Sequence, residues 1–370
     1  MEYLRCDAIE KELRKLRRAI EAYTRSKADE IFGSTVITRR LELDTGLHQA
    51  ALRFVDPSRS IRASSGFAGS AERRIDAQLW YAARDSDCGA GEVADLAAGG
   101  PRPLLVYCHG TAGRPDNATY LVTQLARRGY IVVAPNFPLT STTAFTDVTS
   151  PDISDAGEQV RDVRFLLDQL LSDHRLARAI DPARIGSIGH SLGAITCWFL
   201  SYGAGTRDPR IRATVMLGAG DPVAAARAAG IGLADVEHLP APVPALLVSA
   251  EKDLFTRMIG PPGTAYPRLE RPKFELTIAG GAHMWFLDGD IWPADNTNPD
   301  FLFLQERMPG VAIPGSEERV PLIGPARQQL ITLAAAQGFF DAFLGRDAAA
   351  LGRVLGLPER YPEASLIHAA

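Results

Sequence analysis

Short apolar segments that alternate with helical segments dominate the sequence from residue 104 onward. Strands are predicted at 104–108, 131–134, 185–188, 213–217, 245–249 and 274–278, and helices at 118–128, 155–172, 194–202 and 328–344. Strands with continuous apolar runs are buried on both faces, and helices that alternate with them cover a parallel sheet. The pattern therefore restricts this region to an α/β fold with a mostly parallel central sheet and helices on both faces.

The segment Gly189-His190-Ser191-Leu192-Gly193 stands where one predicted strand passes directly into a helix. A G-x-S-x-G sequence in that setting is typical of a nucleophile elbow, a sharp turn that exposes a serine hydroxyl at the carboxyl edge of the sheet. The glycines let neighbouring backbone approach the turn without a Cβ clash. Ser191 is therefore the candidate nucleophile.

His283 is the candidate general base. A serine hydroxyl is a poor nucleophile at neutral pH unless a base removes its proton. His283 follows the predicted strand at 274–278 through a glycine turn, so we expect it at the same sheet edge as Ser191, where catalytic groups collect in open α/β sheets. His190 lies inside the elbow, and we expect it to point away from Ser191 and to be structural.

Two aspartates compete for the acid that orients the base. Asp253 follows the predicted strand at 245–249, and Asp221 follows the strand at 213–217. The acid fixes the imidazole tautomer and stabilises the imidazolium that forms during the reaction. We favour Asp253 because a strand, a short turn, the acid and then the histidine on the next strand is the usual order. Asp221 remains the alternative.

Two backbone amides are candidates for the oxyanion hole, which needs preorganised donors. The Leu192 N–H follows the nucleophile at a helix start, where N–H groups lack intrahelical partners. The second donor is expected from the loop at 107–113 after the first central strand, and the Thr111 N–H is our choice.

With the elbow, acid, histidine and oxyanion loop in this chain order, the sequence resembles the α/β-hydrolase superfamily. More narrowly, it is similar to dienelactone-hydrolase-like serine esterases, near the platelet-activating-factor acetylhydrolase and cutinase-like polyester hydrolase branches. The matching segments are 77–81, 104–113, 128–135, 160–167, 181–185 and 339–344. The resemblance covers roughly residues 70–345 and implies an α/β-hydrolase fold with a serine nucleophile. In the acetylhydrolase branch the acid can follow the strand after the elbow, which keeps Asp221 open.

The leading functional hypothesis is a serine hydrolase that cleaves carboxylic esters of small molecules through an acyl-enzyme. Trp285, Phe286 and Phe137 follow predicted strand ends and are candidates for the wall of the substrate pocket; packing of these rings into the body is the alternative. The same triad would also serve an acyltransferase, an amidase or a lactone-processing enzyme of a biosynthetic pathway. A ligand-binding protein without catalysis has no need of all three residues.

The sequence divides into residues 1–34 and a hydrolase domain over 35–370. Residues 4–31 are predicted to form an amphipathic helix, which either packs on the main body or forms a homodimer contact. Residues 288–325 depart from the related families because they form a longer irregular insertion, predicted to lie over the active site. The first 35 residues have no recognised counterpart, and Ala82 and Ala83 stand where the relatives usually carry a proline.

Composition excludes several other classes of function. Lys and Arg total 40 against 44 Asp and Glu, a net charge of −4, whereas a nucleic-acid reader is expected to carry a basic excess. No stretch of about 18 apolar residues predicts a membrane span. The four cysteines are scattered, at Cys6, Cys88, Cys108 and Cys197, and residues 1–18 lack an apolar signal core. We therefore expect a cytoplasmic protein with no metal or cofactor.

Overall fold

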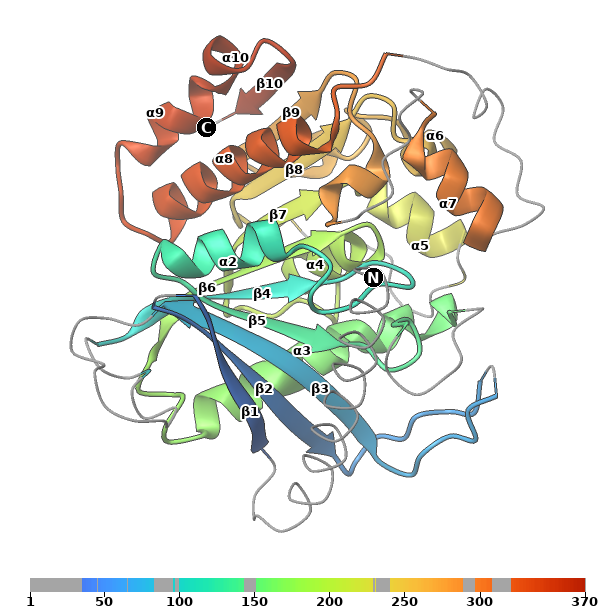
Figure 1. Ribbon diagram of the computed structural model, residues 1–370, viewed down its shortest axis with the longest axis vertical. Helices are drawn as coiled ribbons and strands as arrows, with labels where there is room; N and C mark the ends of the chain where they lie inside the picture. The colour runs from blue at the N-terminus through green and yellow to red at the C-terminus, as the bar shows by residue number, and fades with distance from the viewer. Residues whose placement is uncertain are drawn as a thin grey trace, which may run out of the picture.

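The computed structural model describes residues 35–44, 46–64, 66–82, 96, 100–142, 151–228, 230, 240–288, 297–307 and 321–369. The predicted helix at 4–31 lies outside the described residues. Within them the main feature is a ten-stranded sheet with the order β1-β2-β3-β5-β4-β6-β7-β8-β9-β10 (Figure 1). Its strands are β1 (Thr35–Asp44), β2 (Leu47–Asp56), β3 (Arg73–Ala82), β4 (Arg102–Cys108), β5 (Ile131–Asn136), β6 (Ile180–His190), β7 (Ile211–Leu217), β8 (Ala245–Ala250), β9 (Lys273–Ile278) and β10 (Ala364–Ala369).

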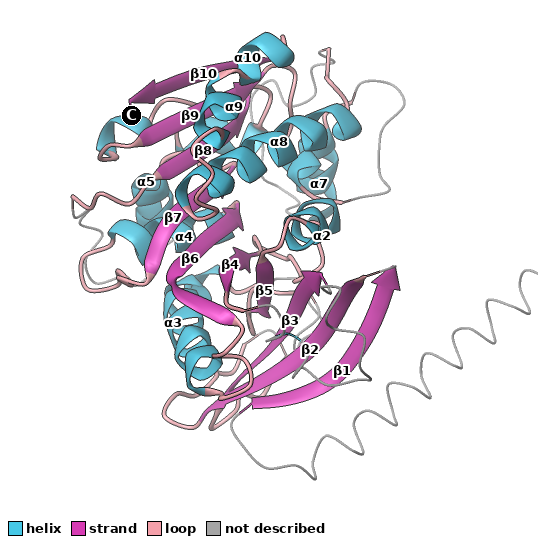
Figure 2. Cartoon of the chain, turned by 90° about the vertical axis from the view of Figure 1, so that its left-hand side faces the viewer, coloured by secondary structure: helices cyan, strands magenta, loops and turns pink. Residues whose placement is uncertain are grey.

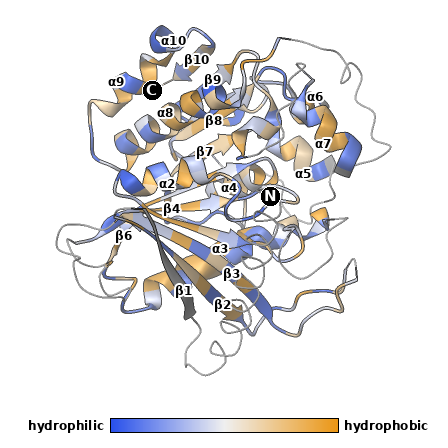
Figure 3. Cartoon of the chain, viewed as in Figure 1, coloured by the Kyte–Doolittle hydropathy of each residue, from blue (hydrophilic) through white to orange (hydrophobic). Residues whose placement is uncertain are grey.

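The central strands from β5 through β9 are parallel, whereas both ends of the sheet are antiparallel. β1, β2 and β3 form an antiparallel meander that joins β5, and β10 pairs antiparallel with β9. Every residue of β4 and β8 is buried, while β2 largely alternates buried and half-buried positions. Burial on both faces explains the continuous apolar runs of the central strands. The hydropathy colouring of Figure 3 shows this apolar centre.

Helices cover both faces of the sheet, as Figure 2 shows. One apolar core contains residues of α3 and α4, and the other contains residues of α2 and α8. The helices are α2 (Thr119–Arg127), α3 (Ala156–Ser172), α4 (Leu192–Tyr202), α5 (Pro222–Ala228), α6 (Leu254–Ile259), α7 (Pro299–Arg307), α8 (Pro325–Phe343), α9 (Ala350–Leu355) and α10 (Leu357–Arg360), with short 3-10 helices at Ile153–Asp155, Tyr266–Arg268 and His283–Phe286. This is the α/β-hydrolase arrangement, and the predicted fold class is confirmed.

A buried ion-pair cluster joins the antiparallel meander to the helical layer. Arg73 on β3 pairs with Asp155 at 2.8 Å and with Asp162 on α3 at 2.6 Å, and all three side chains are at most 3% exposed. Arg59 also contacts Asp162, at 2.8 Å. Buried charges are tolerated only when they are paired and hydrogen-bonded. The cluster therefore fixes the meander against α3 with polar contacts, whereas the central strands rely on apolar packing.

Part of the predicted insertion is regular structure. The structure describes residues 297–307 and 321–325 of the 288–325 segment, together with Asp288, and α7 occupies most of the first stretch. Elements α6 and α7 lie side by side near the carboxyl ends of the central strands (Figure 1). Their position brings the insertion to the edge of the sheet at which the predicted site residues lie.

Candidate active site

Ser191 occupies the turn between β6 and α4, and its backbone is in an unusual conformation. Its φ and ψ angles are 54° and −120°, and positive φ is uncommon for a residue with a Cβ. The Ser191 N–H donates to the Leu217 carbonyl at 2.9 Å, while the Ser191 carbonyl accepts the Ala194 N–H at 2.9 Å. The turn is thus tied to the neighbouring strand β7 and to its own helix.

The two elbow glycines are required by close packing. A Cβ on Gly189 would collide with the backbone of Gly193, and a Cβ on Gly193 would collide with the Cys108 carbonyl at the end of β4. Strand, turn and helix therefore approach one another more closely than side chains allow, which is the physical basis of the predicted motif.

His283 and Asp253 form a buried hydrogen-bonded pair beside the elbow. The His283 Nδ1 and Asp253 Oδ2 atoms are 2.7 Å apart, and the two residues are 3% and 1% exposed. A Cβ at Gly218, which has a φ of 59°, would lie 2.9 Å from His283 Nδ1 and 3.2 Å from Asp253 Oδ2. The backbone of Gly218 therefore backs the pair closely and limits movement of the imidazole.

Burial would by itself lower the pKa of His283, but its acidic neighbours reverse the effect. The charge of Asp253, its hydrogen bond and the charge of Asp300 together hold the pKa of His283 above the ordinary 6.5. A neighbouring anion favours the protonated imidazole. The residue is therefore electrostatically prepared to accept a proton.

Asp221, the alternative acid, lies in a different structural setting. Its Oδ1 accepts the N–H groups of Val223 and Ala224 at 3.0 and 3.1 Å, which caps the start of α5, and its Oδ2 pairs with Arg268 at 3.1 Å. The structure brings Asp253, not Asp221, into hydrogen-bond contact with His283.

The loop after β4 carries the candidate oxyanion donor. The Ala112 N–H donates to the Thr140 carbonyl at 2.8 Å, and the Gly113 N–H donates to the Gly110 carbonyl at 3.0 Å. Within the described part of the chain, the Thr111 N–H has no such backbone acceptor. Leu192 is the first residue of α4, where amides lack an intrahelical acceptor.

His109 holds this loop to the next one. Its Nδ1 lies 2.8 Å from the Gly110 carbonyl, and its Nε2 accepts the Phe137 N–H at 3.1 Å. The two partners fix the neutral tautomer with the proton on Nδ1. Burial also lowers the pKa of His109 to about 4, although the Gly110 hydrogen bond opposes this. His109 therefore acts as a neutral connector between two loops.

His190 lies next to His283 and is also neutral. Its Nε2 contacts the His283 carbonyl at 3.2 Å, and the two rings are 4.5 Å apart between centroids. Burial, followed by the charge of His283, keeps the pKa of His190 well below 6.5. His190 was predicted to be structural; it supports the His283 backbone and also lines the pocket described next.

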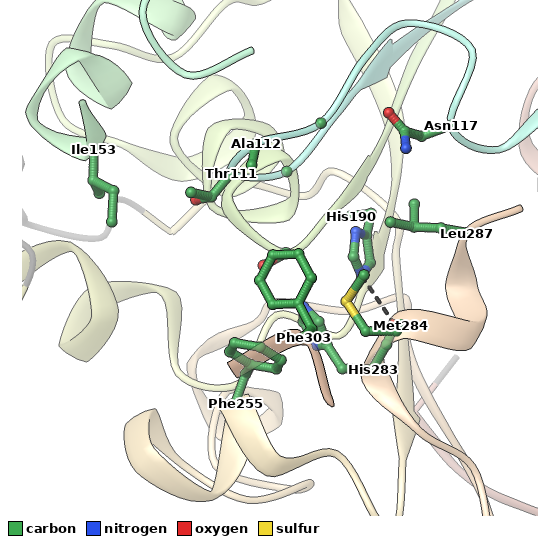
Figure 4. A pocket seen from close by; sticks show the side chains of 13 residues that line it. Thr111, Ala112, Asn117, Ile153, His190, Phe255, His283, Met284, Leu287 and Phe303 are labelled. Atoms are coloured by element: carbon green, nitrogen blue, oxygen red, sulfur yellow. Dashed lines mark hydrogen bonds between the residues drawn. The ribbon is translucent and has the colours of Figure 1, made fainter. Parts of the chain in front are cut away.

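A pocket of about 220 Å³ lies between the elbow, the loop after β4 and α7. Ser191, His283 and Thr111 all line it. Its other walls are largely apolar, and Figure 4 shows the side chains arranged around it. The lining residues are Gly110, Thr111, Ala112, Gly113, Asn117, Ile153, His190, Ser191, Phe255, His283, Met284, Leu287 and Phe303.

The three predicted pocket aromatics lie elsewhere. Phe286 is fully buried in the core that α2 and α8 share, and Trp285 is 4% exposed. Phe137 is fully buried, and its ring packs at 4.9 Å from that of His109. Burial in the body offers these large rings more apolar contact than a pocket wall does, and the structure thus corrects their predicted role.

Phe255 and Phe303 provide the aromatic wall instead. Phe255 on α6 lies 4.6 Å from the His283 ring, and Phe303 on α7 meets Phe255 edge-on at 5.8 Å. The prediction missed them because both helices are short or lie within a segment treated as irregular. The apolar run Phe301–Leu304 directly after Asn-Pro-Asp is a helix-start signal that could have identified α7.

No group of three or more His, Cys, Asp or Glu side chains in the part of the chain that the structure describes is arranged to hold a metal ion. None of the described helices is both long and apolar enough to span a bilayer.

The sheet order, with this pocket at the carboxyl edge of the parallel strands, shows that the chain has the α/β-hydrolase fold. The sequence profile of a family described as chlorophyllase matches residues 93–231. A solved structure of a ferulic acid esterase from Streptomyces cinnamoneus is similar over 87% of this chain and 96% of that chain, with 22% identity and a TM-score of 0.60. No curated protein matches the sequence. The predicted α/β-hydrolase fold is confirmed, and the matches to a chlorophyllase profile and to a ferulic acid esterase agree with the predicted carboxylester hydrolase.

Proposed function

We propose that this protein is a serine esterase in which Ser191, His283 and Asp253 act as nucleophile, base and orienting acid. One observation carries the proposal. Ser191, on a turn with φ of 54°, shares a pocket with His283, whose Nδ1 lies 2.7 Å from Asp253. A strained serine, an imidazole fixed by a buried carboxylate and a pocket that admits a substrate are the parts that acyl transfer requires.

The reaction would proceed in two halves. His283 Nε2, the ring nitrogen that does not contact Asp253, takes the Ser191 hydroxyl proton while Oγ attacks the ester carbonyl carbon. The Thr111 and Leu192 amides stabilise the resulting oxyanion. Collapse of the tetrahedral intermediate breaks the bond to the alkoxy oxygen, which leaves with the proton from His283. A water molecule then repeats the sequence on the acyl-enzyme and releases the carboxylic acid.

The pocket supports an ester with an apolar group next to the scissile bond. Phe255, Phe303, Met284, Leu287 and Ile153 present carbon surface, and among the residues that the structure describes no Lys or Arg side chain lines the pocket. Binding would therefore depend on apolar contact, with orientation set by the few polar groups near Ser191.

Labelling with a fluorophosphonate probe tests the nucleophile. The wild-type protein and a Ser172→Ala control, which changes an exposed serine at the end of α3, should label equally, and Ser191→Ala should not label. Equal labelling of Ser191→Ala and wild type would reject the proposal.

The substrate class is tested with p-nitrophenyl esters of alkanoic acids of increasing length, together with an aromatic acyl ester. Ser191→Ala should lower kcat on every ester that the wild type cleaves by about 10⁶-fold. Analysis of products formed with an added alcohol or amine separates hydrolysis from acyl transfer, since a transferase would yield the new ester or amide rather than the free acid.

A further inference from the structure

The start of α7 brings two buried polar side chains to the active site that the proposed triad does not include. Asp300 is fully buried and Asn298 is 3% exposed. Both come from the segment that the sequence presents as an irregular insertion. A buried carboxylate is unfavourable unless hydrogen-bond donors surround it, so the partners of Asp300 indicate what it holds in place.

Asp300 accepts three backbone hydrogen bonds from two loops. Its Oδ2 accepts the N–H groups of Leu254 and His283, both at 3.0 Å, and its Oδ1 accepts the Met284 N–H at 2.9 Å. Leu254 directly follows Asp253, the proposed acid. One carboxylate therefore joins the loop after β8 to the loop after β9, which are 30 residues apart at Asp253 and His283.

Asn298 completes the connection on the other side of Asp253. Its Nδ2 donates to the Lys252 carbonyl at 2.8 Å, and its Oδ1 accepts the Asp300 N–H at 2.9 Å. The residues immediately before and after Asp253 are thus bonded to Asn298 and Asp300 at the start of α7, and Asp300 also accepts the backbone N–H of His283. All of these contacts are made to residues whose backbone determines the position of the Asp253–His283 pair.

We propose that Asp300, with Asn298, is a positioning residue that holds the His283 and Asp253 loops together for the reaction at Ser191. The inference rests on the proposed function and extends it to the insertion. Asp300 does not touch the reacting atoms. It acts through the backbone of His283 and through its charge. A displacement of a catalytic group by about 1 Å can cost 100-fold in rate.

Charges around His283 support this assignment. Burial, then the charge of Asp253, raises the pKa of Asp300 to about 6, against the lowering effect of His283 and of the amide hydrogen bonds. Asp253 and Asp300 are the acidic groups that act on His283, and the adjacent His190 is neutral. The nearby Lys252 and Glu251 pair with each other at 2.8 Å. As an anion, Asp300 favours the imidazolium that forms during catalysis.

The test is the pH profile of kcat/KM for Asp300→Asn on an ester that the wild type cleaves. The amide cannot accept all three N–H groups, and it removes the charge. We expect kcat to fall about 100-fold with KM nearly unchanged, and the rising limb of the profile to move to lower pH. Rates are normalised by fluorophosphonate titration of active serines, so that loss of folded protein is not counted. Glu306→Gln, which removes an exposed carboxylate from the same helix, should keep the wild-type profile.

The proposal is overturned if Asp300→Asn has the wild-type kcat and the wild-type midpoint of the pH profile. It is also overturned if the loss of rate disappears on normalisation and the midpoint of the pH profile does not change. If Asp300→Asn yields no titratable enzyme, Asn298→Ala decides: a lower normalised kcat with KM preserved supports positioning, and a wild-type kcat overturns it. Ser191→Ala is measured in parallel. Hydrolysis that survives in Ser191→Ala rejects the proposed function itself, whereas an inactive Ser191→Ala beside a wild-type Asp300→Asn rejects only the positioning role.

Discussion

Two regions of this molecule bury a pair of aspartates, and they neutralise them in different ways. Asp155 and Asp162 surround the guanidinium of Arg73, which is 1% exposed and makes hydrogen bonds to both. Asp253 bonds to the imidazole of His283 and Asp300 accepts its backbone N–H, one of three backbone N–H groups that satisfy Asp300. Arginine is always charged in proteins, whereas histidine exchanges its proton near neutral pH. The first pair is suited to holding the fold together, and the second leaves room for a proton to move.

The pKa shifts of Arg73 and His283 also distinguish the two acidic pairs. Burial opposes the charge of Arg73, but Asp162 and Asp155 raise its pKa far above the ordinary value, so the guanidinium stays protonated. The pKa of His283 is also raised, from a starting value of 6.5. Under the proposed mechanism, the cation therefore distinguishes a structural acidic pair from one that takes part in the reaction.

Among changes to the two acidic pairs, the largest expected effect comes from removing the acid beside the histidine. Asp253→Asn should lower kcat/KM by about 10⁴-fold, because the amide no longer fixes the reactive imidazole tautomer. Asp221→Ala is the matched control and should retain most activity, since Asp221 caps α5 and pairs with Arg268. Steady-state kinetics on a p-nitrophenyl ester checks both variants. Wild-type activity in Asp253→Asn, with loss in Asp221→Ala, would transfer the acid role to Asp221.

Removing the cation from the other pair should affect stability and leave the chemistry intact. Arg73→Met removes the arginine partner of buried Asp155 and leaves Asp162 with Arg59 alone, and we expect the free energy of unfolding to fall by about 3–5 kcal/mol. Urea unfolding at neutral pH measures the change, and kcat per titrated serine should stay at the wild-type value. Arg161→Met removes an arginine that is 65% exposed and should cost less than about 1 kcal/mol. An equally small effect of Arg73→Met would show that the ion pairs of Arg73 do not hold the fold together.

The smallest expected effect is a displacement along the pH axis. The base must be neutral to accept a proton, so kcat/KM should rise with pH as His283 loses its proton. Because Asp253 and Asp300 hold the pKa of His283 above 6.5, the midpoint of this limb should lie above the ordinary histidine value. Measurement of kcat/KM in a series of buffers of different pH gives the midpoint. A midpoint below 6.5 would mean that burial outweighs the two carboxylates.

Much of the central fold follows from the sequence alone. The apolar strands predicted between 104 and 278 are present, with ends that differ by a few residues, because buried parallel strands leave a strong pattern. The elbow is as recognisable, since strand, turn and helix are contiguous. The antiparallel strand β10 and the short helices α5, α6 and α9 were not predicted, because brief segments carry little periodicity.

The surroundings of the site were harder to predict than its centre. Ser191, His283 and Asp253 follow strand ends, and the topology of a parallel sheet gathers such positions at one edge. Asp300 follows no strand and lies in a segment rich in Pro and Asp, so only its tertiary contacts distinguish it from a surface aspartate. The choice among aromatic residues failed for a similar reason. Whether Phe286 enters the core or lines the pocket depends on packing partners that are distant in the sequence.

The backbone of Ser191 has a consequence for the protein as a whole. A residue with a Cβ held at a φ of 54° and a ψ of −120° costs of the order of 1–3 kcal/mol relative to a relaxed turn. That cost persists when no substrate is bound, and it is a large share of the roughly 5–15 kcal/mol by which domains are stable. The dense packing around Gly189 and Gly193 must offset it. The stability of the central sheet and the proposed reactivity of the Ser191 hydroxyl therefore cannot be altered independently.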